Sequence, residues 1–507
     1  SLSMTRERSG DWQKVLDVIV EVLQLTPEDR AIFEKRMRQG RRPFEPVPIL
    51  FELSEEQIAR IAVNQFRLPG VEVAAQLVRH YPQQEHFAHS VGYVGRINEQ
   101  ELKRLDPTDY AGTHHIGKTG IERFYEEELH GEVGYEEVET NARGRVMRVL
   151  DRIDPKQGSD LHLYLDARLQ ETATAVMRGR RGAVVAIDVK TGGVLAAVSY
   201  PGFDPNLFVT GISVPNYRAL NEDIDTPLFN RFLQAQYPPG STVKPLILLS
   251  ALQAGVTSWK DTIPGGPLFI GAKQIRDVSI HKATNLYDIL RYSSNIGMSR
   301  IALRMPAQEM INTLSMVGFG MDTGSGLMGE SSGMLPQRRR WSDIERATLS
   351  FGYGLRVTPL QLASAYATLA NKGKRVPLSI IKVTKPPKGE QVIDHNNATA
   401  MLQALEYVVS NAIPKAQIPG YRVGGKSGTA KVAVAGGYGK DYMAWFAGFA
   451  PASNPRFVMV VVINEPKGDA YYGGAVATPP FAEAMGGVLQ LFNIRPDALP
   501  PAVPAKL

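Results

Sequence analysis

The spacing of apolar positions near the start of the chain predicts a helical region followed by strands. The mostly apolar run "VLDVIVEVLQL" (residues 15–25) is interrupted by the charged Asp17 and Glu21, and it predicts an amphipathic helix. It is far shorter than the ~20 apolar residues that cross a bilayer. A Thr-Pro-Glu start predicts a helix in "TPEDRAIFEKRMRQ", and Ser54 is a predicted N-cap for "SEEQIARIAVNQF". Residues 71–82 and 135–153 have strand-like composition.

Further along the chain, the pattern predicts strands on both sides of a long helical region. In "GAVVAIDVKTGGVLAAVSYP" two apolar runs flank a turn signal, which predicts a hairpin. Helical patterns dominate residues 241–372. Strand patterns return in "YRVGGKSGTAKVAV", "MAWFAGFAP" and "RFVMVVVINEP", and "PPFAEAMGGVLQLF" predicts a terminal helix. This order indicates one mixed sheet with a helical insert, an α+β fold.

Length and local composition suggest how the chain divides into domains. A chain of 507 residues is too long for one ordinary core. The turn-rich stretch "DPKQGSD" (residues 154–160) is the predicted boundary. We therefore expect a non-catalytic domain over residues 1–158, a second domain over 159–495 and a Pro-rich tail over 496–507.

Charge and cysteine content exclude several function classes. The 57 Lys+Arg against 51 Asp+Glu give a net charge of +6, which is mild and does not indicate nucleic-acid binding. There is no cysteine, so disulfides, thiolate metal sites and a cysteine nucleophile are excluded. His114 and His115 are adjacent, but no further residue at metal-ligand spacing accompanies them. We interpret them as structural and expect neither metal nor cofactor.

Ser-x-x-Lys occurs three times, and its sequence context favours one copy. In "YPPGSTVKPLILLSALQAG" two prolines and a glycine precede Ser241, and an apolar helix follows. Ser241 is thus predicted at a helix N-terminus, with Lys244 one turn later on the same face. The other copies, "SIHK" (279–282) and "SIIK" (379–382), lie in a polar stretch and in a strand-like run. For "STVK" alone, a capping serine beside a surface lysine is the alternative.

Ser-x-Asn occurs once, in "YSSNIGMSR", at Ser293 and Asn295. As a functional motif, it would give Ser293 a role in proton relay and Asn295 a hydrogen bond to a substrate amide. The alternative is a polar helix cap, which is common.

Lysine, then serine or threonine, then glycine occurs three times, beginning at Lys118, Lys190 and Lys426. The first copy leads into a predicted helix and the second lies at a predicted hairpin tip. The third, Lys426-Ser427-Gly428-Thr429, lies in a predicted strand after the other two motifs. An extended peptide can pair with a strand edge. Lys426 can hold a carboxylate of the substrate, and the hydroxyls of Ser427 and Thr429 can hydrogen-bond the same group. Gly428 has no side chain, so the substrate can approach the strand closely.

Together "PPGSTVKP", "YSSN" and "GGKSGTA" resemble the motifs of a class B penicillin-binding protein, a peptidoglycan D,D-transpeptidase. The N-terminal half ("HSVGYVGRI", "HHIGKTGIERFYEEELHG") is similar to the elongation type, penicillin-binding protein 2. The C-terminal half ("SFGYGLRVTPLQLASAYATLAN", "GFAPASNPRFVMVVVINEP") and Asn295 are similar to the division type, penicillin-binding protein 3. This leaves open a mosaic chain, natural or engineered.

The resemblance implies an elongated N-terminal pedestal, of the dimerisation-domain kind, and a transpeptidase domain. That domain would have a five-stranded antiparallel sheet flanked by helices, with an all-helical subdomain. It implies attack by Ser241 on the D-Ala-D-Ala carbonyl of a stem peptide, with Lys244 as base, and transfer of the acyl group to an amine on a second stem peptide. β-Lactams would acylate the same serine. The backbone N–H groups of Ser241 and Thr429 would form the oxyanion hole.

Four tyrosines near the motifs are candidates for the cleft wall, with ordinary packing as the alternative: Tyr353, Tyr442, Tyr471 and Tyr472. The resemblance further implies a location on the periplasmic face of the bacterial inner membrane, with the family's anchor and the first part of its pedestal absent from this sequence. A membrane glycosyltransferase of the elongation or division complex is the expected partner. A D,D-carboxypeptidase, a serine β-lactamase or a penicillin-sensing receptor domain remains the alternative.

Overall fold

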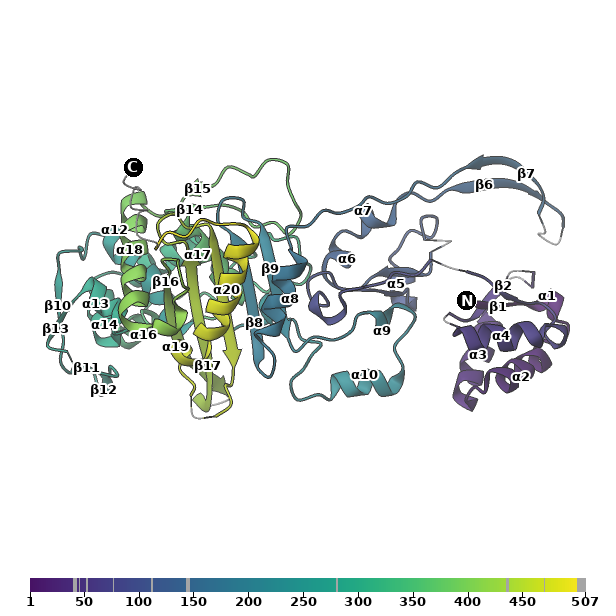
Figure 1. Ribbon diagram of the computed structural model, residues 1–507, viewed down its shortest axis with the longest axis horizontal. Coiled ribbons are helices and arrows are strands. Elements are labelled where there is room, and N and C mark those ends of the chain that lie inside the picture. The colour runs from purple at the N-terminus through teal and green to yellow at the C-terminus, as the bar shows by residue number, and fades with distance from the viewer. Residues whose placement is uncertain are drawn as a thin grey trace, which may run out of the picture.

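The computed structural model is elongated, with the N-terminus far from the large sheet (Figure 1). It describes residues 1–39, 43–44, 46–51, 53–75, 77–110, 113–142, 146–279, 281–434, 437–468 and 470–498. Most of the predicted tail (499–507) lies outside these ranges. Among the described helices, none combines the length and the apolar character that crossing a bilayer requires.

The first 73 residues form a small unit with a core of its own. A three-stranded antiparallel sheet in the order β2-β1-β3 packs with helices whose apolar sides supply Leu16, Ile19 and Phe33. The predicted N-cap is confirmed at Ser54, whose side chain accepts from the N–H of Gln57, and the Gln57 side chain completes a capping box. The elements are β1 (Leu2–Thr5), α1 (Arg6–Ser9), α2 (Trp12–Leu23), α3 (Pro27–Gln39), β2 (Pro46–Leu50), α4 (Glu55–Val63) and β3 (Val71–Val73).

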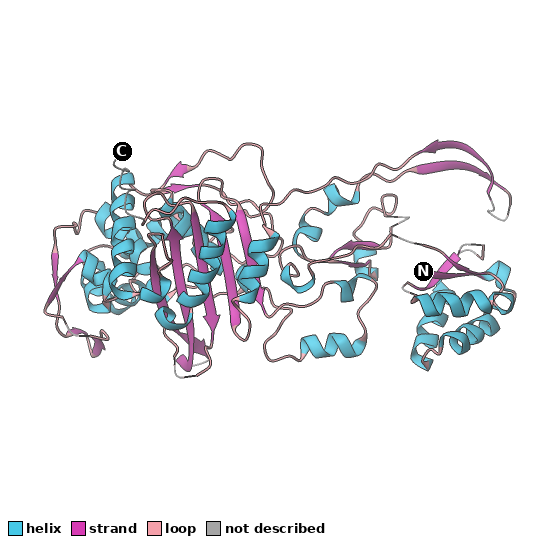
Figure 2. Ribbon diagram, viewed as in Figure 1, coloured by secondary structure: helices cyan, strands magenta, loops and turns pink. Residues whose placement is uncertain are grey.

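The second part of the pedestal connects this unit to the large domain. It contains β4 (Val94–Arg96), α5 (Glu99–Leu102), β5 (His115–Gly117), α6 (Gly120–Phe124), α7 (Glu126–His130), β6 (Tyr135–Thr140) and β7 (Val146–Ile153). The last two strands form a projecting antiparallel ribbon (Figure 2). The strand predicted over 71–82 is wrong beyond Val73. There the chain leaves the sheet after the Ala74 N–H bonds the carbonyl of Ser1.

A five-stranded antiparallel sheet organises the large domain, in the order β16-β17-β18-β8-β9. Its strands are β8 (Arg181–Asp188), β9 (Val194–Tyr200), β16 (Gly424–Val434), β17 (Gly437–Ala450) and β18 (Phe457–Asn464). The central strands β8 and β18 are buried along nearly their whole length. Helices cover both faces of the sheet, and this explains why these strands read as continuous apolar runs rather than alternating ones.

Helices α8 (Ala167–Ala175) and α20 (Thr478–Leu491) pack together over one face, in front of the sheet in Figure 1. The completely buried α17 (Pro359–Ala370) crosses β18 and β8 and separates the sheet from the helical subdomain. The remaining helices are α9 (Asn206–Val209), α10 (Val214–Asn221), α11 (Arg231–Gln234), α12 (Lys244–Gln253), α13 (Leu286–Arg291), α14 (Asn295–Ala302), α15 (Ala307–Met316), α16 (Asp343–Leu349), α18 (His395–Ala412) and α19 (Gly473–Val476).

Short strands decorate the helical subdomain: β10 (Thr262–Pro264), β11 (Leu268–Ile270), β12 (Lys273–Ile275), β13 (Ala283–Asn285), β14 (Lys374–Arg375) and β15 (Glu390–Gln391). The predicted α+β architecture is confirmed, including the hairpin at Lys190 and the terminal helix. The sheet combines strands that are more than 200 residues apart in sequence, as in the pairing of Val461 with Val184.

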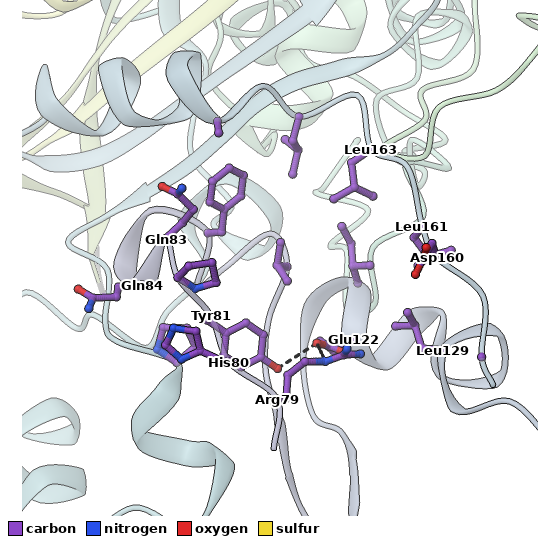
Figure 3. Close-up of a pocket in the computed structure, with 18 of the residues that line it drawn as sticks. Arg79, His80, Tyr81, Gln83, Gln84, Glu122, Leu129, Asp160, Leu161 and Leu163 are labelled. Carbon is purple, nitrogen blue, oxygen red and sulfur yellow. Dashed lines mark hydrogen bonds and ion pairs between the residues drawn. The ribbon is translucent and has the colours of Figure 1, made fainter. Parts of the chain in front are cut away.

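A cavity of about 530 Å³ lies where the pedestal meets the large domain (Figure 3). Glu122 is buried there, and its carboxylate lies 2.7 Å from Arg79 Nε and 3.0 Å from the Tyr81 hydroxyl. None of the predicted site residues lines this cavity. Its ion pair joins two pedestal residues, of which Glu122 is buried and Arg79 is partly exposed.

Candidate active site

The three motifs predicted from the sequence meet at one end of the sheet, beginning with the turn that carries Ser241. A short 3₁₀ turn, Gly240–Val243, leads directly into α12, so Ser241 precedes the helix as predicted. Gly240 has φ +55°, and its carbonyl lies so close to Gly352 that a Cβ on Gly352 would come within 2.1 Å of it. Glycine is therefore required at both positions where these backbone segments cross.

Lys244 is the first residue of α12, is completely buried and points to the Ser-x-Asn segment. Its Nζ lies 2.6 Å from the carbonyl oxygen of Ser293, 3.1 Å from Ser293 Oγ and 2.8 Å from Asn295 Oδ1. Ser293 has φ +55°, a conformation uncommon outside glycine, and both its carbonyl and its hydroxyl face Lys244. Such strain at a site is typical of functional positions.

Lys426 on β16 reaches the same serine from the sheet. Its Nζ lies 3.1 Å from Ser293 Oγ and 3.0 Å from the carbonyl of Ser427, and the residue is 1% exposed. The Ser293 hydroxyl is therefore shared by the two lysine amines. The structure thus brings together Lys244, Ser293, Asn295 and Lys426, which come from three separate segments of the chain.

Burial lowers the pKa of both lysines. For Lys244 the loss of hydration, together with the charge of Lys426, holds the pKa well below its usual range, while the Asp277 carboxylate acts in the opposite direction. Burial lowers the pKa of Lys426 to about 7. A neutral Lys244 amine has two N–H donors and one lone pair. The carbonyl oxygens of Ser293 and Asn295 can take both donors, which leaves the lone pair free to accept a proton.

The Ser241 side chain is partly exposed, and its hydroxyl makes no hydrogen bond to any residue in the described ranges. Lys244 is one turn away but is engaged with Ser293 and Asn295. Catalytic hydrogen bonds are often long in unliganded enzymes and tighten when substrate binds. The serine is thus accessible, and the lysine one turn later is held by the Ser-x-Asn segment.

Strand β16 lies at one edge of the sheet, so its outer side is available to an extended ligand. Gly428 is needed for packing, because a Cβ there would come within 2.8 Å of the Pro239 carbonyl and of the Thr242 methyl group. The Thr429 hydroxyl accepts from the N–H of Gly473 at 3.0 Å and keeps its own proton for another partner. Ser427 is partly exposed on the same strand.

The four tyrosines flank β16 on two sides. The Tyr353 hydroxyl accepts from the N–H of Lys431 at 3.4 Å. Tyr442, Tyr471 and Tyr472 form a stack, with ring centroids 4.2 Å and 4.4 Å apart, and Tyr472 is half exposed. These rings lie at the β17–α19 side of β16, so they are placed to form a wall beside that strand.

Two features of the site were not predicted from the sequence. The hydrogen bond expected between Asn295 and a substrate amide stays a prediction, but the contacts of Asn295 within the protein were not predicted. Its Oδ1 faces Lys244, and its Nδ2 donates to the Arg276 carbonyl at 3.1 Å. Asp277, which we did not single out, accepts hydrogen bonds from the Ser294 hydroxyl and from the N–H of Asn295 at 2.5 Å and 2.6 Å. It lies 18 positions before Asn295 in an irregular segment, so no periodicity signals it.

Two family descriptions match the chain. "Penicillin binding protein transpeptidase domain" matches residues 182–486, and "Penicillin-binding Protein dimerisation domain" matches residues 1–163. The peptidoglycan D,D-transpeptidase FtsI of Escherichia coli K12 is 39% identical over 450 residues, which cover 86% of this chain and 71% of the relative. The peptidoglycan D,D-transpeptidase MrdA of Acinetobacter baumannii is 37% identical over 501 residues, which cover 91% and 74%.

Two solved structures share the fold. PBP2 of Pseudomonas aeruginosa, crystallised with WCK 5153, is 38% identical with a TM-score of 0.74, covering 84% of this chain and 93% of that one. PBP2 of Helicobacter pylori, in complex with MreC, is 25% identical with a TM-score of 0.83, covering 97% and 94%. On these similarities, the chain belongs to the class B penicillin-binding proteins, which carry a transpeptidase domain behind a dimerisation-type pedestal.

Proposed function

We propose that this chain is a peptidoglycan D,D-transpeptidase that cross-links stem peptides through an acyl-serine intermediate and is inhibited by β-lactams that acylate the same serine. The observation that carries the proposal is the pair of buried lysines, Lys244 and Lys426, sharing the hydroxyl of Ser293 beside an accessible Ser241. A serine hydroxyl needs an adjacent base to become a useful nucleophile, and a lysine whose pKa is lowered by burial can be that base.

In the acylation step, Ser241 Oγ attacks the carbonyl carbon of the penultimate D-Ala and its proton passes to the neutral Lys244. The C–N bond to the terminal D-Ala breaks, and the proton passes through Ser293 to the leaving amine. This leaves an ester on Ser241. An amine of a second stem peptide then attacks the ester carbonyl, forms the cross-link and returns the proton to Ser241. Oxidation states do not change in either step.

The substrate would lie along the outer edge of β16. Lys426 would attract the terminal carboxylate, and the hydroxyls of Ser427 and Thr429 would donate to it. The N–H groups of Ser241 and Thr429 would stabilise the oxyanion, and Gly428 keeps the strand close to the Ser241 turn. The tyrosine stack and Tyr353 would contact the donor side chain.

We further propose that the chain acts on the periplasmic face of the bacterial inner membrane and works with a membrane glycosyltransferase in elongation or division. Support comes from two peptidoglycan D,D-transpeptidases, FtsI and MrdA, which match this chain with similar identity. The H. pylori PBP2 complex contains MreC, so that relative binds a protein partner. The proposed division places the boundary between 1–158 and 159–495 at the turn-rich stretch and separates 496–507 by its Pro-rich composition.

The test combines two assays. A fluorescent penicillin should label the protein once per chain, and Ser241→Ala should abolish the label. Ser279→Ala is a matched control, because Ser279 lies in a second Ser-x-x-Lys sequence and, among the described residues, its hydroxyl hydrogen-bonds His281 rather than a site residue. This variant should label normally. Two stem peptides should then yield a cross-linked product and free D-Ala. Release of D-Ala without a cross-link would indicate a carboxypeptidase, hydrolysis of the penicillin would indicate a β-lactamase, and labelling alone would indicate a sensor.

A further inference from the structure

A loop segment of the helical subdomain forms hydrogen bonds to Ser294 and Asn295 of the Ser-x-Asn motif. This segment, which we name the strap (residues 268–277), contains the β11–β12 hairpin and ends at Asp277. The Asp277 carboxylate accepts from the Ser294 hydroxyl at 2.5 Å and from the N–H groups of Asn295 at 2.6 Å and Ile296 at 3.0 Å. It therefore satisfies two of the free N–H groups at the start of α14.

Ser294 and the strap complete this cap in complementary ways. The Ser294 hydroxyl accepts from the N–H of Gly297 at 2.8 Å while donating to Asp277. The carbonyl of Arg276, the neighbouring strap residue, accepts from Asn295 Nδ2 at 3.1 Å. Because the amide nitrogen is held there, the amide oxygen is turned to Lys244. The orientation of Asn295 thus depends on two adjacent strap residues.

We propose that Asp277 is a positioning residue for the proposed acyl transfer, acting through Ser294 and Asn295 to hold the Lys244 amine and to keep its lone pair directed at the proton it accepts. Asp277 does not touch the reacting atoms. It fixes the start of α14, the start of α14 fixes Ser293 and Asn295, and these two residues supply the oxygens that contact Lys244. The inference rests on the proposed function, because it concerns the same base.

The charge of Asp277 affects the pKa of Lys244, so the proposed role can be distinguished from a purely structural one by pH dependence. Charged groups from two elements act on Lys244: Lys426 from β16 lowers its pKa, and Asp277 from the strap raises it. Removing the negative charge should therefore let Lys244 lose its proton at lower pH. The pKa of Lys426 is lowered by burial, so it should stay unchanged when the charge of Asp277 is removed.

Two substitutions separate positioning from charge. Asp277→Asn can keep the contacts, because an amide oxygen can accept from the two N–H groups while its nitrogen donates to Ser294, but the charge is lost. Asp277→Ala loses both. We expect Asp277→Ala to slow penicillin acylation about 10- to 100-fold, the scale of a misplaced catalytic group. We expect Asp277→Asn to keep most of the maximal rate and to shift the acid limb of the pH–rate profile to lower pH, with the alkaline limb unchanged.

Asp261→Asn is the matched control. Asp261 also accepts from a serine hydroxyl and a backbone N–H, at 2.8 Å and 3.0 Å from Ser258, but it bonds none of the site residues. It should leave the rate and both limbs unchanged. If Asp277→Ala does not fold, Ser294→Ala takes its place, because it deletes one donor to Asp277, and it should slow acylation severalfold.

The proposal is overturned if Asp277→Ala acylates within about twofold of the unsubstituted protein, or if the Asp277→Asn profile superimposes on the original one. A slower Asp277→Asn enzyme with an unmoved acid limb would show a merely structural role and would also overturn it. An unsubstituted protein that takes no label at all would instead remove the proposed function, and with it this inference.

Discussion

Two lysines in nearly the same sequence setting, Lys118 in "GKTG" and Lys426 in "GKSG", have different environments in the fold. Lys118 forms an ion pair with Glu101 in the pedestal and keeps 18% of its side chain exposed. Lys426 is 1% exposed, and within the described ranges no carboxylate forms an ion pair with it. The two motifs have nearly the same residues, but Lys118 has a carboxylate partner, whereas Lys426 has a serine hydroxyl and a carbonyl oxygen as partners.

This difference separates a structural lysine from a chemical one. A buried cation without a counter-charge loses hydration and recovers little of it, so the charged form is disfavoured and the pKa of Lys426 falls to about 7. Perturbed groups of this kind cluster at functional sites. An anionic ligand would supply the missing counter-charge. The comparison can be tested at each position of the two motifs.

The largest effect is expected at Lys426. Lys426→Ala should slow acylation by a fluorescent penicillin by about 10²- to 10³-fold, because it removes the cation proposed to attract the substrate carboxylate and one contact of Ser293. Stopped-flow or gel-based labelling rates measure this. A rate within tenfold of the unsubstituted protein would mean that the buried lysine is structural, like Lys118.

The glycines extend the comparison. A Cβ at Gly428 would collide with the Pro239 carbonyl, so Gly428→Ala should push β16 away from the Ser241 turn and slow acylation about 10- to 100-fold. Gly120 has φ +59°, and a Cβ there would come within 2.7 Å of the Ser90 carbonyl. Gly120→Ala should lower the melting temperature but leave the acylation rate of the folded fraction unchanged. The reverse outcome would contradict the assignment of the two motifs.

The pH dependence of acylation should show both buried lysines. Lys244 must be neutral to accept a proton, so the rate should fall as pH drops below its lowered pKa. Lys426 must be charged to attract a carboxylate, so the rate should also fall as pH rises above about 7. Rates measured from pH 4 to 10 should therefore form a bell, reporting the two lysines as a coupled pair. A profile that rises steadily to pH 10 would be inconsistent with a charged Lys426.

The smallest effect is expected at Lys118. Lys118→Ala removes a partly exposed ion pair, so it should lower the melting temperature by roughly 1–3 °C. It should leave the acylation rate within about twofold of that of the unsubstituted protein, because the hydrogen bonds that Lys118 makes to described residues all stay within the pedestal. Calorimetry and the labelling assay measure both. A large loss of acylation would show that the pedestal motif communicates with the site.

Much of the secondary structure could be predicted from the sequence, because caps, turns and periodicity involve residues that are close together along the chain. The N-cap at Ser54, the hairpin at Lys190 and the terminal helix follow from caps, turns and periodicity. The strand expected over 71–82 was wrong beyond Val73, because strand pairing requires a neighbour that residue type does not provide. The contact between the Ser241 turn, the Ser-x-Asn segment and β16 could be anticipated from motif order, but its geometry could not.

Motifs along the chain supply the residue types for the chemistry: a serine ahead of a helix, a lysine one turn later, a Ser-x-Asn segment and a strand lysine. Folding buries Lys244 and Lys426 against one hydroxyl and leaves Lys118 in an ion pair elsewhere. It also places Asp277 where it supports Asn295. The pKa of a side chain and its hydrogen-bond partners depend on which segments pack around it and exclude water. Those segments are distant in sequence, so a local pattern of residues cannot predict them.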